Sequence, residues 1–163
     1  MKSFFYPVVM ILILVSVVLS CSKRRVIIND EVKVITPSQR DSLQTLIKDF
    51  EERTGAEIGV YIFHSLDGRT LSDVSATAVR NSGLAENSLN RGVLITMAMQ
   101  DRQMRIEVGS DLKDVLDDER CETIILKTML PHYIRGKLYI GLTAGVNELI
   151  SIIETKKPTQ PEK

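Results

Sequence analysis

Two short apolar segments in the middle of the chain constrain its fold more than any other feature of the sequence. Residues 57–63 read Glu-Ile-Gly-Val-Tyr-Ile-Phe, and residues 92–99 read Gly-Val-Leu-Ile-Thr-Met-Ala-Met. Both are rich in residues that favour β-strands, and the first is apolar on both faces for much of its length. Such a strand has to be covered from both sides, which is typical of a sheet with helices packed on it. The sequence therefore predicts an α/β protein.

Helices are predicted before, between and after these strands. Thr36 as N-cap, Pro37 as first helical residue and Gln39 as the third residue after the cap begin a helix, and Gly55 ends it. Further helices are expected at residues 71–80, from Asp117 or Asp118 to Pro131, and at residues 138–153.

A third strand completes the expected architecture. Residues 104–108 alternate between apolar and charged side chains, which predicts a half-exposed strand that pairs with residues 92–99 as a hairpin. The order of helices and strands then predicts a three-layer α/β/α sandwich, with a small mixed sheet flanked by helices on both faces.

The composition argues against several classes of function. Lys and Arg together number 21, as do Asp and Glu, so the formal net charge is zero and no excess of cations is available for binding nucleic acid. The chain has no Trp and 5% aromatic residues, which disfavours a platform that stacks bases or sugars. Its two Cys residues are too few for a zinc cage or a disulfide framework.

The N-terminal segment has the pattern of a secretion signal. Lys2 precedes an apolar run over residues 4–19, and Val18-Leu19-Ser20-Cys21 resembles the bacterial lipobox, in which the Cys receives a diacylglycerol group. We therefore expect a lipoprotein-type signal peptide at residues 1–20, lipidation of Cys21, a connector at 21–35, a domain at 36–154 and a disordered tail at 155–163.

The alternative for this segment is an uncleaved anchor helix, which the basic cluster Lys23-Arg24-Arg25 favours. Either interpretation predicts a domain that is tethered to a membrane surface.

Motifs in the rest of the chain resemble those of a known family. They are Arg53-Thr54-Gly55-Ala56-Glu57, Arg91-Gly92-Val93-Leu94-Ile95, Asp101-Arg102 with Arg105-Ile106-Glu107-Val108-Gly109, and Met129-Leu130-Pro131 with Gly141-Leu142-Thr143-Ala144-Gly145. Together they resemble the TPM domain, also called the YgcG-type domain, over residues 36–153. The resemblance implies an α/β/α sandwich on or near a membrane, usually on the side away from the cytoplasm. Family members are linked to the upkeep of membrane complexes, and some have been credited with acid phosphatase activity or with calcium binding through loop carboxylates.

The sequence departs from the family pattern within and just after the third of these motifs. Asp101 is the single acid before Arg102, where the family often has two, and Asp111 and Lys113 replace a glycine and an acid of the family. These departures bear on the metal site that the resemblance implies more than on the fold.

Acidic residues between positions 101 and 122 are the best candidates for binding a divalent cation. Calcium and similar cations prefer several oxygen ligands from flexible loops, and acids here fall in loops or at a helix start. The candidate ligands for calcium or another divalent cation are Asp101, Asp111, Asp117 and Asp118. The alternative is that acids at a helix N-terminus simply complement its dipole.

Two arginines are candidates for binding phosphate. Arg102 and Arg105 belong to the family's strand motif, and a guanidinium group can hold a phosphate with two hydrogen bonds. The alternative for Arg105 is a salt bridge with Glu107, which lies two residues away on the same face of the strand.

Two functions are compatible with the sequence. The first is a lipid-anchored protein of the cell envelope whose domain, outside the cytoplasm, is a non-catalytic module that supports membrane complexes through a membrane or envelope protein partner. The second is a divalent-cation-dependent acid phosphatase of low activity, in which loop acids hold the cation and Arg102 or Arg105 the phosphoryl group. The first is favoured because no convincing catalytic constellation is present in the sequence.

Overall fold

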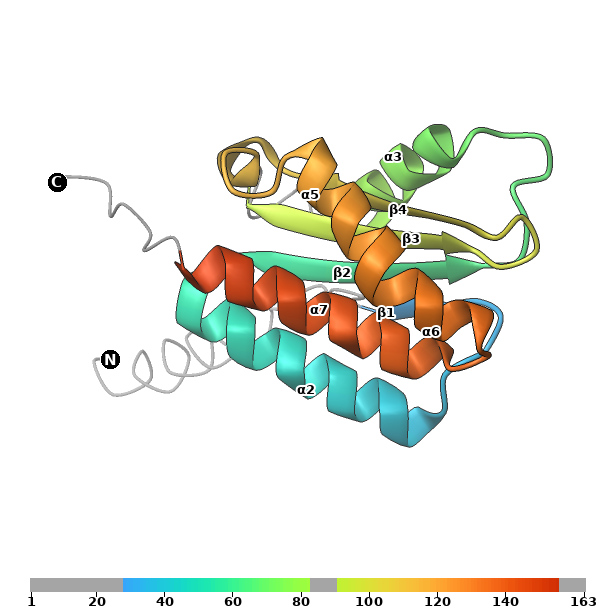
Figure 1. Cartoon of the computed structure of the whole chain (residues 1–163), viewed down its shortest axis with the longest axis horizontal. Helices are drawn as coiled ribbons and strands as arrows, with labels where there is room; N and C mark the ends of the chain where they lie inside the picture. The colour runs from blue at the N-terminus through green and yellow to red at the C-terminus, as the bar shows by residue number, and fades with distance from the viewer. Residues whose placement is uncertain (1–27, 83–90, 156–163) are drawn as a thin grey trace, which may run out of the picture.

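A four-stranded mixed sheet forms the centre of the molecule (Figure 1). The structure is a computed structural model, and it describes residues 28–82 and 91–155. The strands follow one another in the sheet in the order of the chain and are β1 (Ile28–Asp30), β2 (Glu57–Phe63), β3 (Gly92–Ala98) and β4 (Gln103–Val108). The first three are parallel, and β4 is antiparallel to β3. The predicted mixed sheet and the predicted hairpin are both confirmed.

The pairing of β2 with β3 runs along the full length of both strands, from Glu57 opposite Gly92 to Phe63 opposite Ala98. Because side chains alternate across a strand, this register sorts the residues onto two faces. Ile62 of β2, Ile95 of β3 and the residues two positions away from each within its strand belong to the larger of two apolar clusters. The residues between them, such as Tyr61, point to the opposite face.

Helices cover both faces of the sheet, so the predicted three-layer sandwich is confirmed. One face carries two long helices and a connected series of short ones, which together bury the large apolar cluster (Figure 1). These are α2 (Pro37–Thr54), α5 (Asp118–Thr123), the π-helical η2 (Ile124–Met129), α6 (Leu130–Ile134) and α7 (Leu138–Thr155). The opposite face carries α3 (Leu71–Ser82), which contacts β3 and β4.

The caps predicted for α2 are present. Thr36 Oγ1 accepts a hydrogen bond from Gln39 N at 3.3 Å, and Gln39 Oε1 accepts one from Thr36 N at 2.9 Å, which completes a capping box. Gly55 ends the helix in the left-handed conformation, with a φ of 67°. At the start of α5, Asp117 rather than Asp118 is the N-cap, and it accepts from Arg120 N at 2.8 Å.

Strand β1 lies in the segment that the sequence analysis interpreted as a connector, residues 21–35. Three residues are too few to show a strand pattern, so β1 was not predicted. Its position is stabilised by the buried Asp30, whose Oδ2 accepts a hydrogen bond from Ile35 N at 3.0 Å and lies 4.0 Å from the guanidinium of Arg40.

The helix predicted to stop at Pro131 continues beyond it, which corrects that expectation. The chain passes from α5 through the π-helical segment η2 into α6, and Pro131 occupies the first turn of α6. The π-helical turn before it is a local irregularity of the kind that lets a helix continue through a proline, which lacks the usual N–H donor.

Several predictions concern segments that the structure does not describe. The signal peptide, Cys21 and the first part of the connector belong to residues 1–27, and nearly all of the predicted disordered tail belongs to residues 156–163. Within residues 28–82 and 91–155, no helix is long and apolar enough to cross a bilayer.

Helix α7 packs closely against the segment around Met129 through two glycines. A Cβ atom at Gly141 would lie 2.7 Å from the backbone oxygen of Met129 and 2.9 Å from the Cβ of His132. A Cβ at Gly145 would lie 2.7 Å from Cγ of the Met129 side chain. The neighbour of Gly141 is a backbone atom, which moves only if the helices separate. The neighbour of Gly145 belongs to a flexible side chain, which can move aside.

Replacing Gly141 by Ala is therefore expected to destabilise the protein. In a helix without such a contact, Gly→Ala gains about 1 kcal/mol. Here the clash with the Met129 carbonyl should outweigh that gain and lower the free energy of unfolding by about 1–3 kcal/mol, as measured by urea denaturation. Gly145→Ala should cost less, and Ser151→Ala, on the exposed side of α7, should change stability by less than about 0.5 kcal/mol. A Gly141→Ala variant as stable as the parent would contradict this description of the packing.

Candidate functional site

Asp101 lies in the turn between β3 and β4 and has a structural partner. Its Oδ2 accepts a hydrogen bond from Leu66 N at 2.8 Å, which ties the hairpin to the loop that follows β2. Arg102, the next residue, is exposed and adopts a φ of 55°. Both residues therefore lie at the edge of the sheet where β3 ends.

The other three candidate metal ligands lie at the opposite end of β4. After β4 the chain returns to the beginning of β3, where Gly109 N donates to Gly92 O at 2.8 Å, and Asp111, Asp117 and Asp118 follow this point. A strand of six residues at about 3.4 Å per residue separates this loop from Asp101 by about 20 Å. The structure thus groups Asp111, Asp117 and Asp118 in one region of the chain and leaves Asp101 apart from them.

These carboxylates do not converge in the structure. Among the described residues, no group of three or more His, Cys, Asp or Glu side chains could hold a metal ion. Asp117 is used as the cap of α5, and Asp111 Oδ1 accepts a hydrogen bond from Ser110 Oγ at 3.2 Å. The divalent cation remains a prediction from the sequence.

Arg105 pairs with Glu107 on β4, as the simpler interpretation of the sequence predicted. The hydrogen bond to Glu107 is the main cause that raises the pKa of Arg105, and the charge of Asp118 adds to it. Arg105 is therefore close to the start of α5. Arg105, a predicted phosphate ligand, is thus in the same region as Asp118, a predicted metal ligand. Arg102 lies in the turn before β4 instead.

Cys121 is buried in the same region, on the inner side of α5. Burial is the main cause that raises the pKa of its thiol to about 11, and the carboxylates of Asp118 and Asp117 contribute. At neutral pH the thiol is protonated and a poor nucleophile, as expected of a cysteine that packs in the core.

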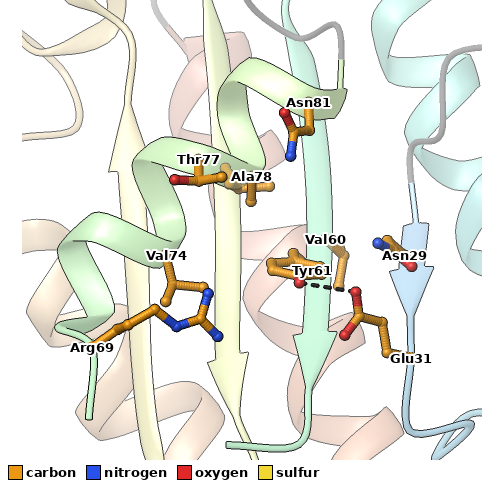
Figure 2. Close-up of a pocket in the computed structure, with 10 residues that line it drawn as sticks. Asn29, Glu31, Val60, Tyr61, Arg69, Val74, Thr77, Ala78 and Asn81 are labelled. Carbon is orange, nitrogen blue, oxygen red and sulfur yellow. Dashed lines mark hydrogen bonds between the residues drawn. The ribbon is translucent and has the colours of Figure 1, made fainter. Parts of the chain in front are cut away.

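A cavity of about 280 Å³ lies on the other side of the sheet, between α3 and β1 (Figure 2). Helix α3 contacts β3 and β4, so its inner side and the strands β1 and β2 form the walls and floor of this cavity. Its apolar side chains are those of Val74, Ala78 and Leu94, and its polar lining is Asn29, Glu31, Tyr61, Arg69, Thr77 and Asn81. Val60 of β2 borders the cavity, although its side chain joins the large apolar cluster on the other face.

Tyr61 is the central polar group of the cavity. Its hydroxyl donates a hydrogen bond to Glu31 Oε1 at 2.9 Å, and its ring stacks on Phe63 with centroids 5.1 Å apart. Partial burial, the hydrogen bond to Glu31 and the negative charge of Glu31 raise the pKa of Tyr61 to about 12, while the positive charge of Arg69 opposes this rise. Glu31 and Arg69 are thus both close enough to Tyr61 to influence its ionisation.

Sequence reasoning did not identify this cavity. Glu31 and Asn29 lie in or beside β1, which was interpreted as a connector, and Arg69 lies in the loop before α3. The available signal was the pair Tyr61 and Phe63, two aromatic residues on the same face of a strand that was otherwise expected to be covered on both faces.

The predicted cation site can be tested by thermal unfolding of the protein in calcium, in magnesium and in EDTA. A cation that binds only the folded state adds about 2.7 kcal/mol at a hundred times its dissociation constant, so calcium should raise the melting temperature by several degrees. The rise should be lost in the Asp117→Asn/Asp118→Asn double variant, because asparagine at position 117 removes the charge and can still cap α5. Asp101→Asn serves as the control, since Asp101 lies at the other end of β4. No shift at about 10 mM calcium would contradict the site.

The arrangement around Tyr61 predicts how its phenol titrates. At pH 11 the phenol should remain largely protonated, because its pKa is raised to about 12. Glu31→Gln should lower this pKa by removing a negative neighbour, and Arg69→Gln should raise it by removing a positive one. The measurement is the pH dependence of the Tyr61 ring carbon resonance, assigned with Tyr61→Phe. Shifts in the same direction for both variants would be inconsistent with the described contacts.

Comparison with known proteins agrees with this architecture. The family model of the TPM domain matches residues 28–152. None of the curated proteins matches the sequence. The match begins at the first residue of β1 and ends within α7, so it includes the strand that lies in the predicted connector.

Solved structures show the same fold at low sequence identity. The N-terminal domain of a protein from P. gingivalis has a TM-score of 0.74 and 22% identity, covering 82% of this chain and 85% of that one. The BA42 protein from Bizionia argentinensis has a TM-score of 0.67 and 20% identity, with coverages of 81% and 90%. The N-terminal domain of the cg2496 protein from Corynebacterium glutamicum has a TM-score of 0.64 and 15% identity, with coverages of 89% and 91%. The family match over most of the chain shows that this protein belongs to the TPM domain family.

Proposed function

We propose that this protein is a lipid-anchored component of the cell envelope whose single TPM domain is a non-catalytic accessory module for membrane complexes. The lipobox-like sequence ending at Cys21 supports the anchor and a location outside the cytoplasm. The family match supports the domain assignment. The partner we propose is a membrane or envelope protein.

The observation that carries this proposal is that several candidate catalytic side chains already form contacts that stabilise the fold. Asp101 holds the loop after β2 through Leu66, Asp117 caps α5, and Arg105 is paired with Glu107. Each of these side chains therefore has a structural role that accounts for its presence without a reaction.

The turn between α6 and α7 offers a surface for such a partner. Ile134 ends α6 with 74% of its surface exposed, and Ile140 begins the exposed side of α7 at 50%. Arg135 and Lys137 lie between them and are also exposed. Large apolar side chains exposed together with cations are common where proteins interact.

One observation favours the alternative, a low-activity phosphatase dependent on a divalent cation. The negative charge of Asp118 contributes to the raised pKa of Arg105, so a carboxylate at the start of α5 acts on this guanidinium. In this alternative the carboxylates of the loop would hold the cation and Arg105 would hold the phosphoryl group.

The proposal predicts that membrane attachment depends on Cys21 and that no phosphate ester is hydrolysed. The Cys21→Ser variant should move from the membrane to the soluble fraction and lose the mass of its lipid, whereas Ser22→Ala should keep both. Both variants and the parent should fail to hydrolyse p-nitrophenyl phosphate at acidic and neutral pH, with or without calcium.

Two results would contradict this proposal. A Cys21→Ser variant that remains in the membrane would favour the uncleaved anchor helix over the lipid. Hydrolysis that is lost in Arg105→Gln and Asp118→Asn but kept in Arg53→Gln would establish the phosphatase, because Arg53 is paired with Glu154 rather than with Glu107.

A further inference from the structure

The cavity between α3 and β1 combines two opposite charges with an apolar wall. The charged groups of its lining are the carboxylate of Glu31 and the guanidinium of Arg69. Figure 2 shows them approaching Tyr61 from different sides, Glu31 from the end of β1 and Arg69 from the segment that leads into α3. Val74 and Ala78 of α3 and Leu94 of β3 supply apolar surface beside them.

Both charged groups are held by the protein and keep binding capacity. Glu31 Oε1 accepts the hydrogen bond from Tyr61, which positions the carboxylate and leaves its second oxygen for a ligand. Arg69 Nε donates to Leu66 O at 3.1 Å, which orients the guanidinium and leaves its two terminal nitrogens for a ligand. Within the part of the chain that the structure describes, no carboxylate lies within ion-pair distance of Arg69.

We propose that this cavity binds a small zwitterion with an apolar side chain, namely a free α-amino acid or a short peptide. The ligand carboxylate pairs with Arg69 and its ammonium group with Glu31, while its side chain packs against Val74, Ala78 and Leu94. This inference concerns the β1 and β2 side of the sheet, whereas Arg105 lies on β4 at the opposite edge. It does not depend on the function proposed above.

The balance of charge favours a zwitterion over a simple ion. An anion attracted by Arg69 is repelled by Glu31, and a cation attracted by Glu31 is repelled by Arg69. A molecule that carries both charges gains from both groups, and each charge-assisted hydrogen bond is stronger than a neutral one. The volume of about 280 Å³ lies just below the range typical of sites for drug-sized ligands, so it suits a ligand smaller than those.

The test compares three matched ligands on the full-length protein in detergent micelles. L-valine carries both charges, isovalerate lacks the ammonium group, and isobutylamine lacks the carboxylate. Binding is followed by the amide resonances of Tyr61, Val74 and Thr77 in heteronuclear NMR spectra. L-valine should bind with a dissociation constant on the order of 1 mM, and isovalerate and isobutylamine about tenfold more weakly. The dipeptide Val-Val distinguishes a peptide from a free amino acid as the better ligand.

Charge-neutral variants give a result that a purely structural role cannot produce. Arg69→Gln and Glu31→Gln should each weaken L-valine binding by about tenfold. Glu31→Gln should at the same time strengthen isovalerate binding, and Arg69→Gln should strengthen isobutylamine binding, because each removes the repelling charge. Arg53→Gln and Glu52→Gln, on the opposite side of the sheet, are the matched controls. They should leave the affinities for L-valine, isovalerate and isobutylamine unchanged.

Two outcomes would overturn the proposal. The first is the absence of resonance shifts with about 50 mM L-valine and with the dipeptide. The second is that L-valine, isovalerate and isobutylamine bind equally well to the parent protein. This comparison uses no variant, so it does not depend on whether a variant folds.

Discussion

The continuous pairing of β2 with β3 is the interaction on which the rest of the structure depends. Their parallel register places Val60, Ile62 and Ile95 under α2 and α7, where they join the buried core, and turns Tyr61 and Thr96 to the other face. A parallel pair is stable only when both faces are covered, because its strands are mostly apolar. The helices on either side, the edge strand β1 and the hairpin to β4 all build on this central pair.

The two faces of the sheet differ in how completely helices cover them. Several helices pack on the side of the large core, whereas α3 is the helix that lies on the other side within the described residues, and it contacts β3 and β4. The cavity beside Tyr61 is a consequence of this asymmetry, since α3 leaves room over β1 and β2. The pairing of β1 with β2 brings Glu31 to the rim of that cavity, although 30 positions separate it from Tyr61.

The elements that sequence reasoning predicted well are those with strong local signals. The capping box of Thr36 and Gln39 and the stop at Gly55 depend on hydrogen bonds within a few residues, so their pattern is visible in the sequence. β1 and the continuation of the helix through Pro131 were missed, since a three-residue strand depends on its partner β2 and the π-helical segment depends on its packing against α7. For the candidate site, the Arg105–Glu107 pair was predicted from two positions on one strand, but the separation of Asp101 from Asp117 was not, because the loop assignment gave no distance between them.

The sequence by itself determined the fold class, the family motifs and the caps of α2, because these follow from the spacing of apolar residues and from local hydrogen bonds. It also carries the lipobox-like pattern at Cys21. Only the tertiary structure decided which charged groups influence one another: Arg105 of β4 with Asp118 of α5, and Tyr61 with Glu31 and Arg69 in the cavity under α3. The physical reason is that such interactions depend on strand register and helix placement, which are set by long-range packing rather than by neighbours in the chain.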